Sequence, residues 1–111
     1  MITFDDFKKL EIKIGTVRSA EKIEGADRLL KLVMDFGTET RELVSGIAPF
    51  YPDPLVLVGK QLPVLMNLEP RVIRGHTSEG MVLYAVETTE GGEKLTTLEP
   101  ALHLLDGSVV R

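Results

Sequence analysis

The stretch that decides the fold is Asn67-Leu68-Glu69-Pro70-Arg71-Val72-Ile73-Arg74-Gly75-His76-Thr77-Ser78-Glu79-Gly80-Met81. It separates two apolar runs, 62–66 and 82–86, each of which is typical of a β-strand. Its proline and two glycines favour neither a helix nor a plain hairpin. Most connections inside a compact domain are about 4–6 residues long, so a polar connection of this length needs an explanation. It is either a surface loop packed on its own side chains or a ligand-binding loop held by a rigid sheet.

Alternation of apolar and polar residues predicts the strands that precede this stretch. The first strand begins at Leu10, and its alternation changes at Gly15, which predicts a β-bulge or a sharp bend there. A turn at 24–27 leads into a second strand, and the third strand covers 41–46. The apolar residues that the second strand directs inward are Leu30, Leu32, Met34 and Phe36.

The segment 47–58 contains three prolines, which exclude a sheet interior and permit only short helical turns. Its apolar side chains are suited to closing the end of a barrel; they are Ile47, Ala48, Phe50, Tyr51, Leu55 and Val58. A fourth strand follows with Leu62, Val64, Met66 and Leu68 inward, and a fifth covers 81–86. This element order is that of an OB-fold, a five-stranded Greek-key barrel. We therefore expect one all-β domain, with short helices, over residues 1–111.

Segments at both ends of the chain exceed what such a barrel requires. Residues 3–10 predict a short helix in which Thr3 and Asp6 form a capping box. The tail from Glu87, with a hinge at Gly91-Gly92, predicts short strands or turns. We expect the barrel core to cover about residues 10–86, and residues 1–9 and 87–111 to be dimerisation elements.

Several classes of function lack the residues that they need. The chain has no cysteine, which excludes disulfides, thiolate zinc sites and cysteine nucleophiles. His76 and His103 lie in separate segments without an HxxH or HxxE partner, and no P-loop, dinucleotide or GxSxG motif occurs. We therefore predict a protein that is not an enzyme and holds no metal and no cofactor.

Hydropathy and the N-terminal residues indicate where the protein resides. No apolar run approaches the roughly 20 residues that span a bilayer. The first residues lack the basic start and apolar core of a secretion signal. We expect a soluble, cytoplasmic protein that does not associate with membranes.

The net charge of −4 does not by itself indicate a nucleic-acid binder, but the distribution of charge allows one basic face. Lys13, Lys31 and Arg41 are expected to point away from the core, and the loop adds Arg71 and Arg74. In an OB-fold the outer faces of strands 2 and 3, with the loops after strands 1 and 4, form the groove that takes oligonucleotides or oligosaccharides. Arginine suits phosphate because its planar fork donates two hydrogen bonds at once. The alternative is that Arg74 pairs with Glu79 or Glu69 and only ties the loop down.

An ordered set of short motifs carries a family resemblance. The motifs are Asp6-Phe7-Lys8-Lys9-Leu10, Ile14-Gly15, Gly25-Ala26-Asp27-Arg28-Leu29-Leu30, Val44-Ser45-Gly46-Ile47, Leu57-Val58-Gly59-Lys60, Asn67-Leu68-Glu69-Pro70-Arg71, Arg74-Gly75 and Ser78-Glu79-Gly80-Met81. In this order they resemble the tRNA-binding domain family, densely over residues 4–86 and more loosely in the tail. That family is found at the C-terminus and as the β subunit of methionyl-tRNA synthetases, and as free-standing dimeric tRNA-binding proteins.

The resemblance implies a homodimeric OB-fold that binds tRNA by its shape and assists an aminoacyl-tRNA synthetase chain, most closely the methionyl enzyme. It implies that the dimer forms through the N-terminal helix and the C-terminal extension. The RNA-binding residues that it implies are Lys31, Arg41, Ser45, Asn67, Arg71, Arg74, Ser78 and Met81, with Lys13 where the family often has arginine. The alternative is that Ser78 and Glu79 only brace the loop and that Met81 belongs to the core.

Three departures from the family pattern thin the expected basic face. Thr16, Val72 and Glu69 stand where relatives often carry cations or, at the last position, proline. We therefore expect weak tRNA binding that is strongly sensitive to salt. Two rivals stay open: a dimeric peptide-binding chaperone, because a secretion-related branch of the family binds unfolded chains, and a purely structural dimerisation domain.

Overall fold

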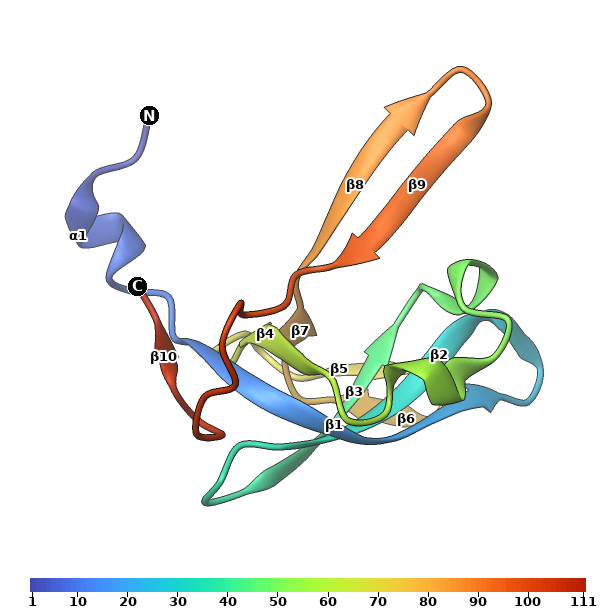
Figure 1. Cartoon of the computed structure of the whole chain (residues 1–111), viewed down its shortest axis with the longest axis horizontal. Helices are drawn as coiled ribbons and strands as arrows, with labels where there is room; N and C mark the ends of the chain where they lie inside the picture. Colours follow the sequence, from blue (N-terminus) through green and yellow to red (C-terminus); the bar gives the residue numbers. More distant parts are fainter.

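The longest strand, β1 (Ile12–Ile23), is the centre of the computed structural model, which describes all residues 1–111 (Figure 1). It pairs antiparallel with strands on both sides, β2 and β4, and at its start also with β10. The other strands are β2 (Ala26–Asp35), β3 (Thr40–Ser45), β4 (Gln61–Leu65), β5 (Arg71–Ile73), β6 (His76–Ser78), β7 (Met81–Val82), β8 (Tyr84–Thr89), β9 (Gly92–Thr97) and β10 (Val109–Val110). The helical segments are α1 (Phe4–Phe7), η1 (Ala48–Phe50) and η2 (Pro54–Leu57).

The main sheet runs in the order β3-β2-β1-β4-β7 and curls into a barrel. Its open side is closed between β3 and the end of the loop that begins at residue 67. There the Glu79 N–H donates to the Glu42 carbonyl (2.9 Å), and the Val44 N–H donates to the Ser78 hydroxyl (3.0 Å). The predicted all-β OB-fold with short helices is confirmed.

The barrel interior holds the apolar rows predicted for the second and fourth strands. Leu30, Leu32 and Met34 on β2 are completely buried, and so are Leu62 and Val64 on β4. Two expectations at the margins of this core are wrong. Leu57, not Leu55 or Val58, closes the barrel beside η2, because residues three apart share one side of a 3₁₀ turn and the side that carries Leu55 and Val58 is exposed. Leu68 lies past the end of β4 and is exposed.

The β-bulge expected at Gly15 lies elsewhere. β1 continues through Gly15, and the shifts in its register with β2 occur between Val17 and Ser19 and between Lys22 and Ile23. Gly15 is needed for packing, since a Cβ atom there would lie 2.5 Å from the ring of Phe36. The glycine gives space to an aromatic ring and does not mark the bend.

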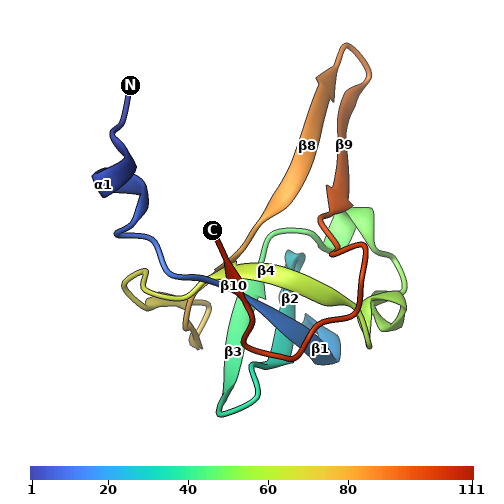
Figure 2. The ribbon, with the colours of Figure 1, turned by 60° about the vertical axis from the view of Figure 1, so that its left-hand side comes forward.

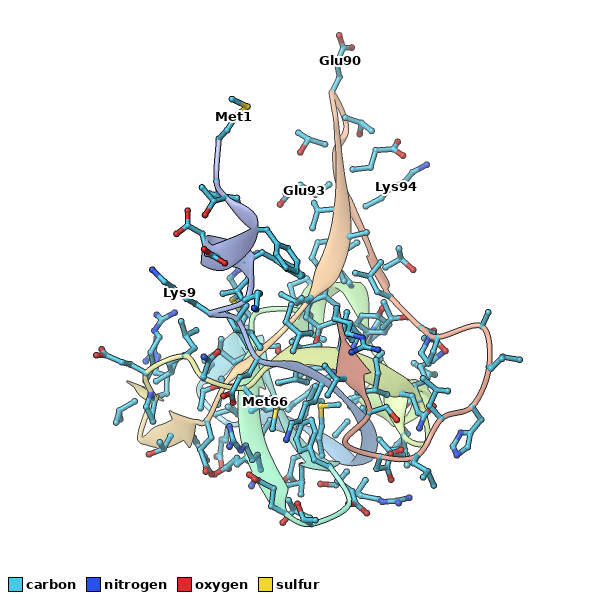
Figure 3. All side chains as sticks on the ribbon, turned by 90° about the vertical axis from the view of Figure 1, so that its left-hand side faces the viewer. Met1, Lys9, Met66, Glu90, Glu93 and Lys94 are labelled. Atoms are coloured by element: carbon cyan, nitrogen blue, oxygen red, sulfur yellow. The ribbon has the colours of Figure 1, made fainter.

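The fifth strand is shorter than expected, because β7 ends at Val82. From Tyr84 the chain leaves the barrel, and β8 pairs only with β9. This β8–β9 arm projects from the barrel as a long hairpin (Figures 1 and 2), with Glu90-Gly91 as its turn and Gly92 as the first residue of β9. Glu90 marks the tip of the arm in Figure 3. The strand expected over 81–86 is thus divided between barrel and arm.

The two ends of the chain lie near each other at one side of the barrel (Figure 1). The predicted capping box is present, since the Thr3 hydroxyl accepts from the Asp6 N–H and the Asp6 carboxylate accepts from the Thr3 N–H. No residue of α1 is buried, and the side chain of Phe4 is 72% exposed. No helix combines the length and the apolar character that a membrane crossing demands.

Candidate nucleic-acid interface

The stretch from Asn67 to Met81 contains a small hairpin, which corrects the expectation that it is not one. β5 and β6 pair through a two-residue turn at Arg74-Gly75, in which both residues have positive φ (51° and 80°). Positive φ at both central positions is what a type I′ hairpin turn requires, and asparagine or aspartate is the usual first residue. Because residue 74 is arginine, the sequence did not indicate this type of turn.

Asn67 fastens the start of this stretch to the N-terminal segment. Its side-chain amide donates to the Lys9 carbonyl (2.6 Å), and its side-chain oxygen accepts from the Glu11 N–H (2.9 Å). The neighbouring Met66 N–H donates to the Glu11 carbonyl (2.7 Å). The amide of Asn67 therefore already has intramolecular partners on both of its polar atoms.

Ser78 and Arg41 fasten the end of the stretch. The hydroxyl of Ser78, which is buried, accepts from the Val44 N–H and donates to the Gly80 carbonyl (3.1 Å). Arg41 lies opposite the inward-facing Met34, so it shares the inner face of β3 and does not point outward as expected. Its guanidinium donates to the carbonyls of Met66 (2.7 Å) and Glu79 (3.1 Å), and thus joins the two ends of the stretch.

Arg71 and Arg74 carry the free positive charge of the hairpin. Both are exposed, and neither forms an ion pair. In particular, the alternative pairing of Arg74 with Glu79 or Glu69 is not formed. The rigid attachments on either side hold these two cations out from the barrel, where a phosphate backbone can reach them.

Met81 is also available at this surface, since its side chain is 46% exposed and does not belong to the core. It lines a small cavity of about 50 Å³ between the hairpin and the barrel. The residues lining this cavity are Val44, Leu68, Glu69, Arg71, Ile73, Ser78, Gly80 and Met81. A cavity of this size, with apolar side chains beside one arginine and one glutamate, accepts only a small group of a ligand.

Lys31 takes part in a chain of charges across the outer face of the barrel. Its ammonium group lies 2.9 Å from the Glu21 carboxylate and 3.7 Å from that of Glu42. The hydrogen bond from Lys31 lowers the pKa of Glu21, and the same bond raises the pKa of Lys31. The chain continues to the hairpin, because Nδ1 of His76 lies 3.5 Å from the same Glu42 oxygen. Sequence reasoning missed Glu21, Glu42 and His76 as members of this face.

Two further predicted site residues, Ser45 and Arg41, form side-chain hydrogen bonds within the protein. The hydroxyl of Ser45 lies 3.3 Å from that of Tyr84, and burial raises the pKa of Tyr84 to about 12. The guanidinium of Arg41 binds Glu39, and this hydrogen bond lowers the pKa of the Glu39 carboxyl. Lys13 is half-buried and makes no ion pair. No group of three or more His, Cys, Asp or Glu side chains is arranged to hold a metal ion.

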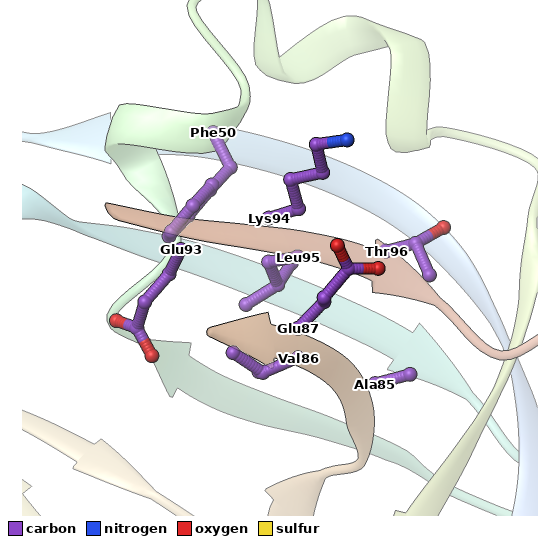
Figure 4. Close-up of a pocket in the computed structure, with 8 residues that line it drawn as sticks. All are labelled: Phe50, Ala85, Val86, Glu87, Glu93, Lys94, Leu95 and Thr96. Carbon is purple, nitrogen blue, oxygen red and sulfur yellow. The ribbon is translucent and has the colours of Figure 1, made fainter. Parts of the chain in front are cut away.

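A second hollow lies at the base of the β8–β9 arm, away from these cations. Figure 4 shows Leu95 and Val86 of the arm beside Phe50 of η1, with Glu87, Glu93 and Lys94 around them. Its volume is about 660 Å³. Its two glutamates and single lysine make it a poor place for a polyanion, which leaves the hairpin side as the candidate interface.

Comparison with known proteins places these features in a family. A family model described as a putative tRNA binding domain matches residues 12–108. Methionine–tRNA ligase of Enterococcus faecalis is 44% identical over 108 residues, which are 96% of this chain and 16% of the ligase. The chain thus spans about one sixth of the length of that curated relative.

Solved structures agree along the whole chain. A MetRS-related protein from Pyrococcus horikoshii has a TM-score of 0.90 and 37% identity, covering 100% of this chain and 98% of its own. The chaperone CsaA from Bacillus anthracis has a TM-score of 0.86 and 29% identity, covering 100% of this chain and 99% of its own. The arm and both terminal segments are therefore shared with these structures, along with the barrel.

Proposed function

Since the chain belongs to the putative tRNA binding domain family, we propose that it is a non-catalytic module that binds tRNA by shape through the β5–β6 hairpin. The observation that carries the proposal is the pair Arg71 and Arg74, exposed and without ion pairs on a hairpin that is fastened at both ends. Because the hairpin is held in place before RNA arrives, little conformational entropy is lost when it binds.

The remaining site residues take two kinds of role in this proposal. Lys13, Lys31 and Met81 contact RNA beside the hairpin. Asn67, Ser78, Ser45 and Arg41 hold the hairpin and the adjoining strands in position, in keeping with their intramolecular hydrogen bonds. Lys31 shares its charge with two glutamates, so we expect it to contribute less affinity than Arg71 or Arg74.

We further propose that the module acts in the cytoplasm as a homodimer and assists an aminoacyl-tRNA synthetase, the methionyl enzyme being favoured by the 44% identity to that ligase. In this arrangement residues 10–86 bind RNA, and residues 1–9 and 87–111 join the two copies. A weak RNA site linked to the site of a catalytic chain raises the effective concentration of tRNA without any new contact.

The experiment that tests the proposal measures tRNA binding by filter retention over a series of salt concentrations. With about 4–5 phosphate contacts per protomer, we expect log Kd to vary with log salt with a slope of magnitude about 3–4. Duplex DNA and an unfolded peptide serve as competitors, and both should bind more weakly than tRNA. A slope near zero, or duplex DNA binding as well as tRNA, would reject binding of tRNA by shape and charge.

Peptide binding is the second candidate, favoured by the structural similarity to chaperone CsaA and by the exposed side chain of Met81. Methionine adapts its shape to varied apolar partners. The same competition decides between the two, because affinity for the unfolded peptide that exceeds affinity for tRNA and does not change with salt would favour the chaperone.

A further inference from the structure

We infer that His76 is a positioning residue whose protonation strengthens RNA binding, because it links the β5–β6 hairpin to a carboxylate on the outer face of the barrel. The inference rests on the proposed function and adds to it a dependence on pH that the family assignment does not contain. It comes from one feature of the structure, a chain of four charged or titratable side chains that crosses the barrel face from β1 to β6.

The geometry places the imidazole at the end of this chain. Nδ1 of His76 lies 3.5 Å from Oε1 of Glu42, and the same oxygen lies 3.7 Å from the Lys31 ammonium. Both the imidazole and the carboxylate are about one third exposed, so solvent does not fully screen their interaction. Lys31 is shared with Glu21, so it cannot neutralise Glu42 alone.

The elements that pack most closely against β6 are β5 and β3. Its partner strand β5 places the uncharged Ile73 directly opposite. The charged neighbours are Glu42 on β3, Lys31 on β2 and Glu21 on β1 beyond it, and Arg74 in the adjoining turn. With neutral histidine, Glu21, Lys31 and Glu42 together carry a net charge of −1. Protonation of His76 brings the net charge of the four side chains to zero.

Two consequences for RNA follow from that single proton. The imidazolium pairs with Glu42, which holds the hairpin and its two free arginines against β3. Its positive charge also offsets the net negative charge of these side chains on the face that the phosphates approach. Histidine is the side chain whose charge, when unperturbed, changes between about pH 5 and 8. Because the RNA-bound state favours the added proton, affinity for tRNA must rise as the pH falls.

The test compares tRNA affinity near pH 6 and near pH 8 at fixed salt, using the full chain. Removing one unfavourable charge is comparable to gaining one phosphate contact, and we expect Kd to fall by about fivefold at 0.1 M salt. His76→Gln should bind equally at both pH values, with the weaker affinity. His76→Lys, which is charged throughout, should bind near pH 8 as tightly as the original chain binds near pH 6.

The chain offers a matched control, because His103 is its other histidine and is exposed in the C-terminal segment. His103→Gln should keep the full pH dependence. A second variant tests the pairing itself: Glu42→Gln removes the carboxylate that lies beside the imidazole, so tRNA affinity in this variant should differ less between the two pH values.

The outcomes separate the two proposals. Equal tRNA affinity at both pH values, or a pH dependence that persists in His76→Gln, overturns the role of His76 and leaves tRNA binding intact. Absence of tRNA binding at both pH values overturns the proposed function, and this inference falls with it. A pH dependence of tRNA affinity that is unchanged in Glu42→Gln contradicts the proposed pairing of His76 with Glu42 directly.

Discussion

Gly15 and Phe36 illustrate how a single residue fixes the packing of the barrel. The ring of Phe36, which is almost fully buried, lies where the side chain of residue 15 would be. A Cβ atom at position 15 would be 2.5 Å from ring carbon Cε1 and 2.9 Å from Cζ. An aromatic ring held on all sides by core residues cannot yield by rotating a flexible end.

We therefore expect Gly15→Ala to lower the free energy of unfolding by about 1–3 kcal/mol, the usual cost of overpacking. Urea unfolding followed by circular dichroism measures it. Gly46→Ala is the matched control, since nothing lies within 4 Å of a Cβ there and its φ is ordinary. Equal stability of the two variants would show that Phe36 can move aside.

At the residue scale, sequence patterns identified the exposed arginines and the inward rows, because both follow from side-chain chemistry and strand periodicity. They did not identify Arg41 as a clamp, since its partners are backbone carbonyls at residues distant in sequence. The row of interacting side chains that links Glu21 through Lys31 and Glu42 to His76 was not predicted either. Glu21 faces Lys31 because of the register shifts on both sides of it, between Val17 and Ser19 and between Lys22 and Ile23, and no residue type signals these shifts.

Among the elements, the C-terminal segment is attached to the barrel by a buried polar cluster. The Asp106 carboxylate accepts from the Thr16 hydroxyl (2.5 Å) and from the Gln61 amide (3.3 Å). The Gln61 amide also donates to the Leu104 carbonyl (2.6 Å) and its oxygen accepts from the Leu104 N–H (3.0 Å). These bonds set the position from which β10 pairs with β1.

Replacing Asp106 with alanine leaves the buried Thr16 and Gln61 short of partners, which costs about 1–3 kcal/mol. We expect faster hydrogen exchange at the Gly107 N–H, which donates to the Ile14 carbonyl (2.7 Å), and at the Ile14 N–H, which donates to Ser108. Glu93→Ala on the exposed arm should leave both rates unchanged. Unchanged exchange in Asp106→Ala would mean that β10 stays attached without the cluster.

Elements whose residues pack locally were the easiest to predict. The capping box of α1, the 24–27 turn and the helical segment between β3 and β4 follow from local chemistry. The division of 81–86 between β7 and β8 does not, since that run is apolar throughout and reads as one strand. Whether its second half stays in the barrel depends on where β4 ends and on the pairing of β8 with β9, which are tertiary features.

For the whole molecule, apolar surface concentrates near the two ends of the chain. Phe4, Phe7 and Leu10 line a groove together with Val109 and Val110. The helix α1 contains two phenylalanines and no buried residue. A helix this short is only marginally stable in water unless it packs against another surface. The apolar surface near the termini supports the proposed assembly of two copies.

Sedimentation equilibrium should therefore give twice the 12.3 kDa mass of the single chain. Polar substitution of two groove residues, Phe4→Ser with Val109→Ser, should return the mass to that of one chain. Leu55→Ser provides the control, since this side chain is 67% exposed but lies on η2, outside the groove. A single-chain mass for the unsubstituted protein at all concentrations would refute the dimer.

The measurement that tests the central claim most directly is tRNA affinity after removal of both free hairpin charges. Arg71→Ala with Arg74→Asn keeps the turn, because asparagine tolerates the positive φ at residue 74. We predict that affinity at 0.1 M salt falls roughly tenfold or more and that the log–log salt slope decreases by about 1.5. Lys60→Ala with Lys94→Ala removes the same charge outside the hairpin and should change affinity far less. Unchanged tRNA affinity in the hairpin variant, or an equal loss of affinity in both variants, would contradict the claim that this hairpin binds RNA.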